Sequence, residues 1–372
     1  MKVTRNGQSK HYRTVSFDKT NNKVRLIEQR LLPHQFKIIS TKNYVETSQA
    51  IKDMIVRGAG AIGATAAYGL AQGAQIFQGN GIKTFEKHIA KVYQTLANAR
   101  PTAIDPINAM QTMLAKMAGQ TVANQKSMAL TLAEQFADDD VAYCQKIGYF
   151  GEPLIQNGAQ ILTHCNAGWL AFVDYGSATA PMYSAKARNK KFHVFCDETR
   201  PRSQGAALTA WELAQESISH DIIVDNASGH LMQRGEIDLV IVGSDRTLGR
   251  TGEVTNKIGT YTKAVLAKQH NIPFYVTIPL STIDWKLKSG LEIPIEERSP
   301  QEVLRAWGAA DSGRRQSVSI ANPSSTARNP SFDVTPPELI TGIITPVGIF
   351  KPKELWKNRA KLGFNNKKLN LL

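Results

Sequence analysis

The chain has 372 residues, of which 42% are hydrophobic and 20% charged, the composition of an ordinary globular protein with about two domains. No run of eighteen uncharged apolar residues occurs, and the N-terminal MKVTRNGQSKHYR has no apolar segment behind it, so we expect neither a membrane span nor a secretory signal. Cys144, Cys165 and Cys196 are too few and too scattered for a disulfide framework or a zinc ribbon, which indicates a reducing cytoplasm.

The formal net charge is +14, and the last 22 residues, from Lys351, hold seven Lys or Arg against one Glu. A basic excess suits an anionic small-molecule substrate, because it raises the local concentration of that substrate. No basic run is interleaved with aromatic residues, as a nucleotide-stacking surface would require. We therefore expect a small anionic substrate and do not expect nucleic acid as a partner.

Residues 1–150 are predicted to form a domain that begins with a β-hairpin and continues as helices. TVSF and VRLIEQ, within residues 14–32, are β-prone and flank the turn-rich DKTNNK. Thr47 and Ser48 are expected to cap a helix through AIKDMIV. Helical spacing recurs in four further segments, namely AIGATAAYGLAQGAQIF, 83–99, 106–118 and 128–147.

From Gly151 the pattern changes, and residues 151–350 are predicted to form a second domain around a mostly parallel sheet. Short apolar runs alternate with helical segments, an order typical of right-handed βαβ units. The apolar runs are AQILTHC, KFHVFCDE, DIIVDN, DLVIVGSD and PFYVTIP. Residues 309–328 are rich in Ser, Gly and Arg and are expected to form a long loop, and residues 351–372 a basic C-terminal tail.

Polar and reactive side chains follow three of the predicted strands. In a parallel sheet, ligands bind beyond the carboxyl ends of the strands. The residues at these ends are His164-Cys165-Asn166, Asp197-Glu198-Thr199-Arg200 and Gly243-Ser244-Asp245-Arg246. Their convergence on one edge predicts a catalytic crevice.

Cys165 and Asp245 are the strongest candidates for chemistry at this edge. A thiol at a helix N-terminus is biased toward thiolate, although a free cysteine is also often a small buried hydrophobe. A carboxyl group that burial keeps protonated can act as a general acid. Asp245 could instead cap a helix or pair with Arg246, and the sequence leaves both alternatives open.

Two segments could hold an anion. Arg57-Gly58-Ala59-Gly60-Ala61-Ile62-Gly63 opens a helical pattern with exposed backbone N–H groups and an arginine, or its small residues simply allow close helix packing. It matches neither the dinucleotide fingerprint nor a Walker loop. Asn256-Lys257 is expected to open another helix, either as a phosphate contact or as an ordinary surface cap.

Taken together, the motifs resemble the methylthioribose-1-phosphate isomerase family, which is grouped with the regulatory subunits of the translation initiation factor 2B. The motifs, in order, are RGAGAIGATAAYGL, ARPTA, ILTHCNAG, DETRPRSQGAALTAWEL, VGSDR, NKIGTYTKAVLAK, PFYVTIPLSTID, EIPIEER and NPSFDVTPPELIT. The resemblance implies a small, mainly helical N-terminal domain, a Rossmann-like C-terminal domain with a mostly parallel sheet, and a homodimer.

The resemblance also implies an aldose-to-ketose isomerase of methionine salvage that converts 5-methylthioribose 1-phosphate to 5-methylthioribulose 1-phosphate. The family's catalytic cysteine falls on Cys165 and its catalytic aspartate on Asp245. Its substrate contacts fall on Arg57, Gly58, Ala59, Arg100, Gln204, Asn256 and Lys257. This chemistry needs no metal or redox cofactor, and no cluster of metal-ligand residues is evident in the sequence.

Five residues depart from the family pattern near the inferred pocket, namely Gly60, Asp105, Trp169, Phe172 and Asp174. Trp169 could reshape the pocket for the methylthio group or could pack into the core. The departures leave two other substrates open, 5-deoxyribose 1-phosphate and ribose 1,5-bisphosphate. A non-catalytic regulatory protein resembling the translation-factor subunits is the alternative from a different class.

Overall fold

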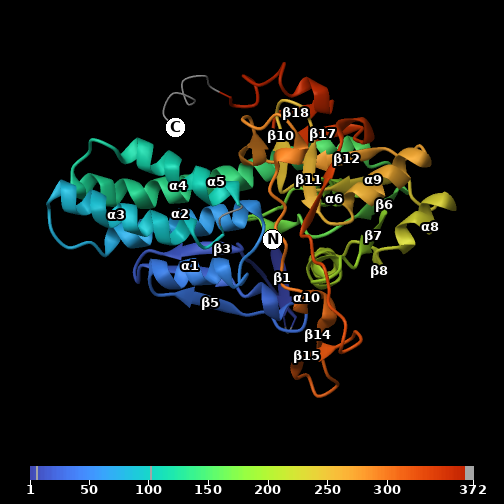
Figure 1. Cartoon of the computed structure of the whole chain (residues 1–372), viewed down its shortest axis with the longest axis horizontal. Helices are drawn as coiled ribbons and strands as arrows, with labels where there is room; N and C mark the ends of the chain where they lie inside the picture. Colours follow the sequence, from blue (N-terminus) through green and yellow to red (C-terminus); the bar gives the residue numbers. More distant parts are fainter. Residues whose placement is uncertain (6, 101–102, 365–372) are drawn as a thin grey trace. The chain divides into compact units, whose positions relative to one another are not determined.

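The computed structural model describes residues 1–5, 7–100 and 103–364 (Figure 1). They form two compact units. The first unit comprises Met1–Gln145 together with Gly168–Gly176, and the second comprises Lys146–Ala167 and the chain from Ser177 onward. The short segment 168–176 thus returns to the first unit after the chain has entered the second.

The first unit contains two small antiparallel sheets. β1 (Lys2–Arg5) pairs with β2 (Gln8–His11), and a second sheet has the order β3 (Val15–Asp18), β4 (Lys23–Ile27) and β5 (Ile38–Thr41). The predicted hairpin corresponds to β3 and β4. β1 and β2 were not predicted because their residues are mostly polar and exposed, which leaves no alternating apolar pattern.

Five helices complete the first unit, and the last of them continues into the second unit. They are α1 (Tyr44–Lys52), α2 (Ala59–Gln75), α3 (Ile82–Ala97), α4 (Ile104–Met117) and α5 (Val122–Gly151). Helix α2 is buried along almost its whole length, because its small residues let α1, α3 and α4 pack closely around it. The predicted cap at Thr47-Ser48 is wrong, since α1 begins earlier and the Asn43 side chain accepts hydrogen bonds from the N–H groups of Val45 and Glu46.

The second unit is built on a seven-stranded sheet that is parallel except at one edge, as predicted. Its order is β18 (Gly348–Phe350), β17 (Gly342–Thr345), β12 (Phe274–Thr277), β9 (Leu239–Val242), β6 (Gln160–Thr163), β7 (His193–Asp197) and β8 (His220–Ile223). Only β18 runs antiparallel to its neighbour. The helices of this unit are α6 (Ala180–Ala187), the π-helix η4 (Gly205–Thr209) that runs into α7 (Ala210–Gln215), α8 (Ala227–Gln233) and α9 (Thr260–Gln269).

A second sheet and a hairpin lie after β9 in the chain. The sheet has the order β13 (Ile283–Asp284), β10 (Arg246–Leu248), β11 (Val254–Lys257) and β16 (Phe332–Thr335), and the hairpin pairs β14 (Arg305–Ala309) with β15 (Arg315–Ser319) after the short α10 (Gln301–Leu304). Single 3-10 turns occupy Gln29–Leu31 (η1), Glu152–Leu154 (η2), Trp169–Ala171 (η3), Leu280–Thr282 (η5), Gly290–Glu292 (η6), Pro337–Leu339 (η7) and Pro352–Glu354 (η8).

Two expectations are wrong in this region. Asn256 and Lys257 end strand β11 and do not open a helix, since the helix begins at Thr260. The expected loop 309–328 contains the whole of β15. Strand β15 was missed because it is short, polar and mostly exposed, and pairing with β14 stabilises it without a continuous apolar run.

Residues 351–364 pack on the second unit. Leu355 and Leu362 are buried in its core, and the rings of Trp356 and Phe364 contact Trp285. Two basic groups are stacked on this cluster, since the guanidinium carbons of Arg250 and Arg359 lie 4.1 and 4.9 Å from the Trp356 ring centroid. Removing residues 351–372 would therefore remove core side chains as well as charge. The end of the predicted tail, residues 365–372, lies outside the described residues.

Among the described residues, no helix combines the length and the apolar character that crossing a bilayer requires.

Candidate active site

Cys165 lies two residues after the end of β6 and is buried, with a left-handed backbone conformation at φ of +67°. Its N–H donates to Thr199 Oγ1 at 2.8 Å, and its carbonyl accepts from Thr209 Oγ1 at 2.7 Å. A non-glycine residue with positive φ is held there at a cost of about 1–3 kcal/mol, so surrounding contacts must stabilise it. These two hydroxyl groups therefore hold both the backbone N–H and the carbonyl group of Cys165 in place.

Thr199 follows β7 and is itself left-handed, with φ of +63°. Its N–H and that of Arg200 donate to the two carboxylate oxygens of Asp225, at 2.7 and 2.8 Å. Asp225 therefore holds the loop after β7 in the shape that presents the Thr199 hydroxyl to Cys165. Thr199 was placed at this sheet edge by the sequence, but Asp225 was missed because it follows the weakly patterned strand β8.

Gln204 meets Cys165 at the start of the helical segment η4–α7. The Cys165 thiol donates to Gln204 Oε1, with a sulfur-to-oxygen distance of 3.6 Å. This contact stabilises the protonated thiol. If the side-chain amide of Gln204 rotated by about 180°, its N–H group would instead donate to a thiolate. Gly205 makes the approach possible, because a Cβ at this position would overlap the carbonyl oxygen of Asp197. The π-helical turn that follows is a geometry often found at functional sites.

Asn166, the residue after Cys165, is anchored by a chain of buried polar side chains. Its amide nitrogen lies 2.9 Å from Glu212 Oε1 and 3.1 Å from Thr209 Oγ1, and the Tyr183 hydroxyl donates to the other Glu212 oxygen at 2.8 Å. Burial and the neighbouring Glu212 raise the pKa of Tyr183 well above its ordinary value. The chain links β6, α6 and α7 and stiffens the base of the site.

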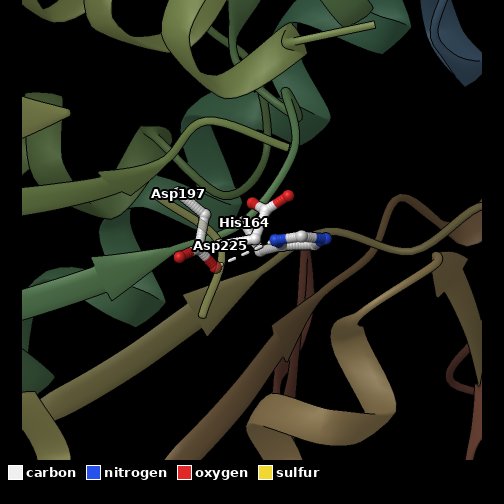
Figure 2. A group of neighbouring side chains, drawn as sticks. All are labelled: His164, Asp197 and Asp225. Carbon is white, nitrogen blue, oxygen red and sulfur yellow. Dashed lines mark hydrogen bonds and ion pairs between the residues drawn. The ribbon is translucent and has the colours of Figure 1, made fainter. Parts of the chain in front are cut away.

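His164, Asp197 and Asp225 form a group of potential metal ligands at the carboxyl ends of β6, β7 and β8 (Figure 2). Each is already engaged, since Asp197 Oδ2 contacts His164 Nδ1 at 2.9 Å and Lys263 Nζ at 3.2 Å, and Asp225 binds backbone N–H groups. The ammonium group of Lys263 supplies the positive charge that a metal ion would bring. The geometry therefore fits a charge network better than a metal site.

Asp245 lies between β9 and β10 and is exposed. Its N–H donates to the carbonyl oxygen of Thr255 at 2.9 Å, which fixes the backbone next to β11. Arg246 contacts Asp284 at 3.4 Å. The interpretation of Asp245 as a general acid assumed a buried carboxyl group, whereas this residue is exposed in the structure.

Asn256 and Lys257 lie on β11 just before the turn that leads to α9. The Asn256 amide donates to Thr260 Oγ1 at 3.0 Å, and Lys257 Nζ donates to the Ser331 carbonyl at 2.8 Å while lying 4.6 Å from the Phe332 ring centroid. The first turn of α9 is capped by Asp333, which accepts from the N–H groups of Gly259 and Tyr261. Burial raises the pKa of Asp333 despite these bonds.

Arg57, Gly58, Ala59 and Arg100 all belong to the first unit. Arg57 is buried, Gly58 has φ of +91° directly before α2, Ala59 is the first residue of that helix and Arg100 is half-buried. Pro101 and Thr102 of the ARPTA motif lie outside the described residues. Of the expected site residues, the structure thus shows contact between Cys165 and Gln204, which both lie in the second unit.

Replacing Gly58 by alanine is expected to destabilise the first unit by about 3 kcal/mol. A Cβ at this position would overlap the backbone of Ala171, and the positive φ adds strain. The measurement is the urea-unfolding midpoint of Gly58→Ala against Gly79→Ala, a control that also has positive φ but meets only the edge of the Phe77 ring. Equal effects of the two substitutions would contradict the close-packing argument.

The five departures from the family pattern are all buried in the first unit. A Cβ at Gly60 would overlap Asp140 Oδ1 and press on the Phe172 ring, so its glycine matches these larger neighbours. Trp169 is fully buried, as its core-packing interpretation requires. Asp105 is buried on α4, and Asp174 contacts His11 at 2.6 Å and the amino group of Met1.

Cys144 and Cys196 are also buried, and burial raises the pKa of both thiols above the ordinary value. Both therefore remain protonated small hydrophobes, as predicted from their places in a helix and a strand.

Comparison with known proteins agrees with the sequence motifs. Residues 55–352 match the model of the Initiation factor 2 subunit family. The methylthioribose-1-phosphate isomerase of Cereibacter sphaeroides is 49% identical over 334 residues, which cover 88% of this chain and 90% of that protein. The similar protein of Brucella anthropi, with the same name, is 46% identical over 92% of this chain and 95% of its own length.

Two solved structures share the fold. The crystal structure of 5-methylthioribose 1-phosphate isomerase from Pyrococcus horikoshii matches with a TM-score of 0.82 and 40% identity, covering 95% of this chain and 96% of that one. The structure of translation initiation factor eIF-2B, subunit delta, from A. fulgidus matches with a TM-score of 0.78 and 38% identity over 95% and 100% of the two chains. The chain belongs to the Initiation factor 2 subunit family, within the group that contains the methylthioribose-1-phosphate isomerases.

Proposed function

We propose that the protein is an aldose–ketose isomerase of methionine salvage that converts 5-methylthioribose 1-phosphate to 5-methylthioribulose 1-phosphate. The names of its nearly half-identical relatives support this assignment. The main structural support is the conformation of Cys165. Its backbone is strained, and its thiol contacts Gln204 at the carboxyl edge of a parallel sheet. A purely regulatory protein has no evident need for a thiol held in this way.

The substrate determines which groups the reaction needs. The phosphate on C1 keeps the sugar in its ring form, so the bond between C1 and the ring oxygen must break first. Asp245 is the proposed general acid that protonates the ring oxygen. Because Asp245 is exposed in the structure, we propose that bound substrate covers its carboxyl group and excludes water from it.

Hydrogen then moves from C2 to C1, and the alcohol at C2 becomes the ketone. Either a base removes the C2 proton to give an enediol-like species that is reprotonated at C1, or a hydride moves directly from C2 to C1. Cys165 is the base in the first route and stabilises the transition state in the second. Both routes conserve every atom and electron of the sugar, so the isomerisation requires no external oxidant, and we propose no cofactor.

The remaining family positions are proposed to hold the substrate. Arg57, Arg100 and Lys257 are the candidate partners of the phosphate dianion, which prefers charged donors. The backbone at Gly58 and Ala59 and the amides of Gln204 and Asn256 are proposed as neutral contacts. We further propose a homodimer that works in the cytoplasm.

The second candidate is a non-catalytic regulatory protein, which the similarity to the eIF-2B delta subunit favours. Within the enzyme class, the group at C5 is the open question, and 5-deoxyribose 1-phosphate and ribose 1,5-bisphosphate are the competing substrates.

One assay separates these possibilities. Purified protein is incubated with each of the three sugar phosphates, and ketose formation is followed by NMR. We expect kcat/KM to be highest, by at least about tenfold, for the methylthio sugar. Preference for another sugar would reassign the substrate, and binding without turnover of any of them would favour the regulatory function.

A further inference from the structure

His164, Asp197 and Lys263 form a buried charge network beside Cys165, and Figure 2 shows the contact between the imidazole and the Asp197 carboxylate. His164 Nδ1 lies 2.9 Å and Lys263 Nζ 3.2 Å from the same oxygen, Asp197 Oδ2. All three side chains are almost completely buried. Lys263 also donates to the carbonyl oxygen of Asp225 at 3.1 Å. Neither general acid–base chemistry nor phosphate binding, as proposed above, uses this network.

The other ring nitrogen of His164 contacts the turn between β11 and α9. Nε2 lies 2.9 Å from the carbonyl oxygen of Ile258, which can only accept, so this nitrogen carries a hydrogen. Asp197 Oδ2 is an acceptor as well, because an ammonium group such as that of Lys263 can only donate hydrogen bonds to it. Both ring nitrogens therefore donate, and only the protonated imidazole ring can do so.

The turn is shaped to receive the ring. Ile258 lies between Lys257 and Gly259, and Gly259 has φ of +101°. A Cβ at Gly259 would lie 3.2 Å from His164 Nε2, so glycine allows the close approach. The ring thus links the end of β6, which continues into Cys165, to the turn after Asn256 and Lys257.

We propose that His164 is a positioning residue for the isomerase: with both ring nitrogens donating, it ties the Asn256–Gly259 turn to the strand ends that carry Cys165 and Asp197. This inference rests on the proposed function, because the turn is where the phosphate of the substrate would bind. Around the ring, Asp197 on β7, Asp225 after β8 and Asp333 on β16 supply negative charge, and Lys263 on α9 supplies positive charge. The three carboxyl groups offset the charges of His164 and Lys263.

Two substitutions separate the two ring nitrogens. In His164→Asn the amide can take the place of Nδ1 but loses the bond to Ile258, whereas in His164→Gln the amide can reach Ile258 but loses Asp197. We expect the KM for 5-methylthioribose 1-phosphate to rise about tenfold in His164→Asn and less than about threefold in His164→Gln, with kcat changed by less than about threefold in both. His193→Gln, at the opposite end of β7, is the control and should match the wild type.

A readout that needs no catalysis accompanies the kinetics. In protein labelled with ¹⁵N-histidine, the His164 ring, identified by its loss in His164→Gln, should show both nitrogens protonated at pH 7.5. In Asp197→Asn, which removes the negative charge but keeps the size, the same ring should carry a single proton.

A singly protonated ring in the wild type would overturn the proposal, as would equal KM effects of the two His164 variants. If the wild type turns over none of the sugars, the proposed function is wrong. The NMR experiment still shows whether both ring nitrogens of His164 carry a hydrogen. In that case calorimetric titration with inorganic phosphate replaces KM, and the same difference between His164→Asn and His164→Gln is expected. Melting temperatures confirm that each variant is folded.

Discussion

Cys165→Ser is expected to lower kcat for the methylthio sugar by about a thousandfold while leaving the fold intact. Serine has nearly the same size, keeps a hydrogen bond to Gln204 and places no larger side chain in the buried site. Its hydroxyl does not ionise near neutral pH, however, and it is far less polarisable than sulfur. A thousandfold loss corresponds to about 4 kcal/mol of transition-state stabilisation. Steady-state kinetics and the melting temperature are the two measurements.

Cys144→Ala is the matched control, because it removes another buried thiol from the same chain. It should retain at least about half of the wild-type kcat. Asp245→Asn should show a loss comparable to Cys165→Ser if the carboxyl group protonates the ring oxygen. Full activity of Cys165→Ser would assign the hydrogen transfer to another group and leave Cys165 a structural role.

The position of several candidate residues at strand ends could be predicted from the sequence, because the carboxyl ends of parallel strands lie at one edge of the sheet. Cys165, Thr199 and Asp245 were all found in this way, since each follows a continuous apolar run. The contact of Gln204 with Cys165 was implied only by the family resemblance. It depends on Gly205 lying against the carbonyl of Asp197, a packing detail that no local pattern encodes.

Other features could not be derived from local patterns. Asn256 and Lys257 were assigned to a helix because the capping signal of α9 is distant in sequence, in Asp333 on β16. The network of His164 and Lys263 joins residues almost one hundred positions apart. The return of residues 168–176 to the first unit likewise depends on tertiary packing, and the alternation of strands and helices in the sequence does not reveal it.

A buried carboxyl group in the first unit gives the second large prediction. Asp140 on α5 is buried, and burial raises its pKa to about 7, even though its Oδ2 accepts the N–H of Val173 at 2.7 Å. The nearby carboxylates of Asp105 and Asp174 contribute to this upward shift of the pKa, and the charge of Arg13 opposes it. In the folded protein Asp140 is therefore protonated below about pH 7, whereas its ordinary pKa of 3.8 applies in the unfolded chain.

Between these two pKa values the folded state binds more protons than the unfolded state, so the free energy of unfolding falls as pH rises. From pH 5 to pH 8 the loss from this group should be about 3 kcal/mol, at roughly 1.4 kcal/mol per unit up to pH 7. Asp140→Asn keeps an acceptor for the Val173 N–H and carries no charge. The variant should match the wild type near pH 5 and be more stable by up to about 3 kcal/mol at pH 8.

Urea-unfolding midpoints measured at pH 5, 6, 7 and 8 test this expectation. Asp138→Asn is the control, because Asp138 lies on the same helix, is 59% exposed and pairs with Arg13 at the surface. An exposed ion pair contributes at most about 1 kcal/mol, and its removal should not change the slope with pH over this range. If Asp140→Asn follows the wild-type slope, Asp140 is ionised throughout, and its charge must be compensated within the fold. A flatter slope in Asp140→Asn alone would identify this carboxyl group as the one that makes the first unit less stable in alkaline solution.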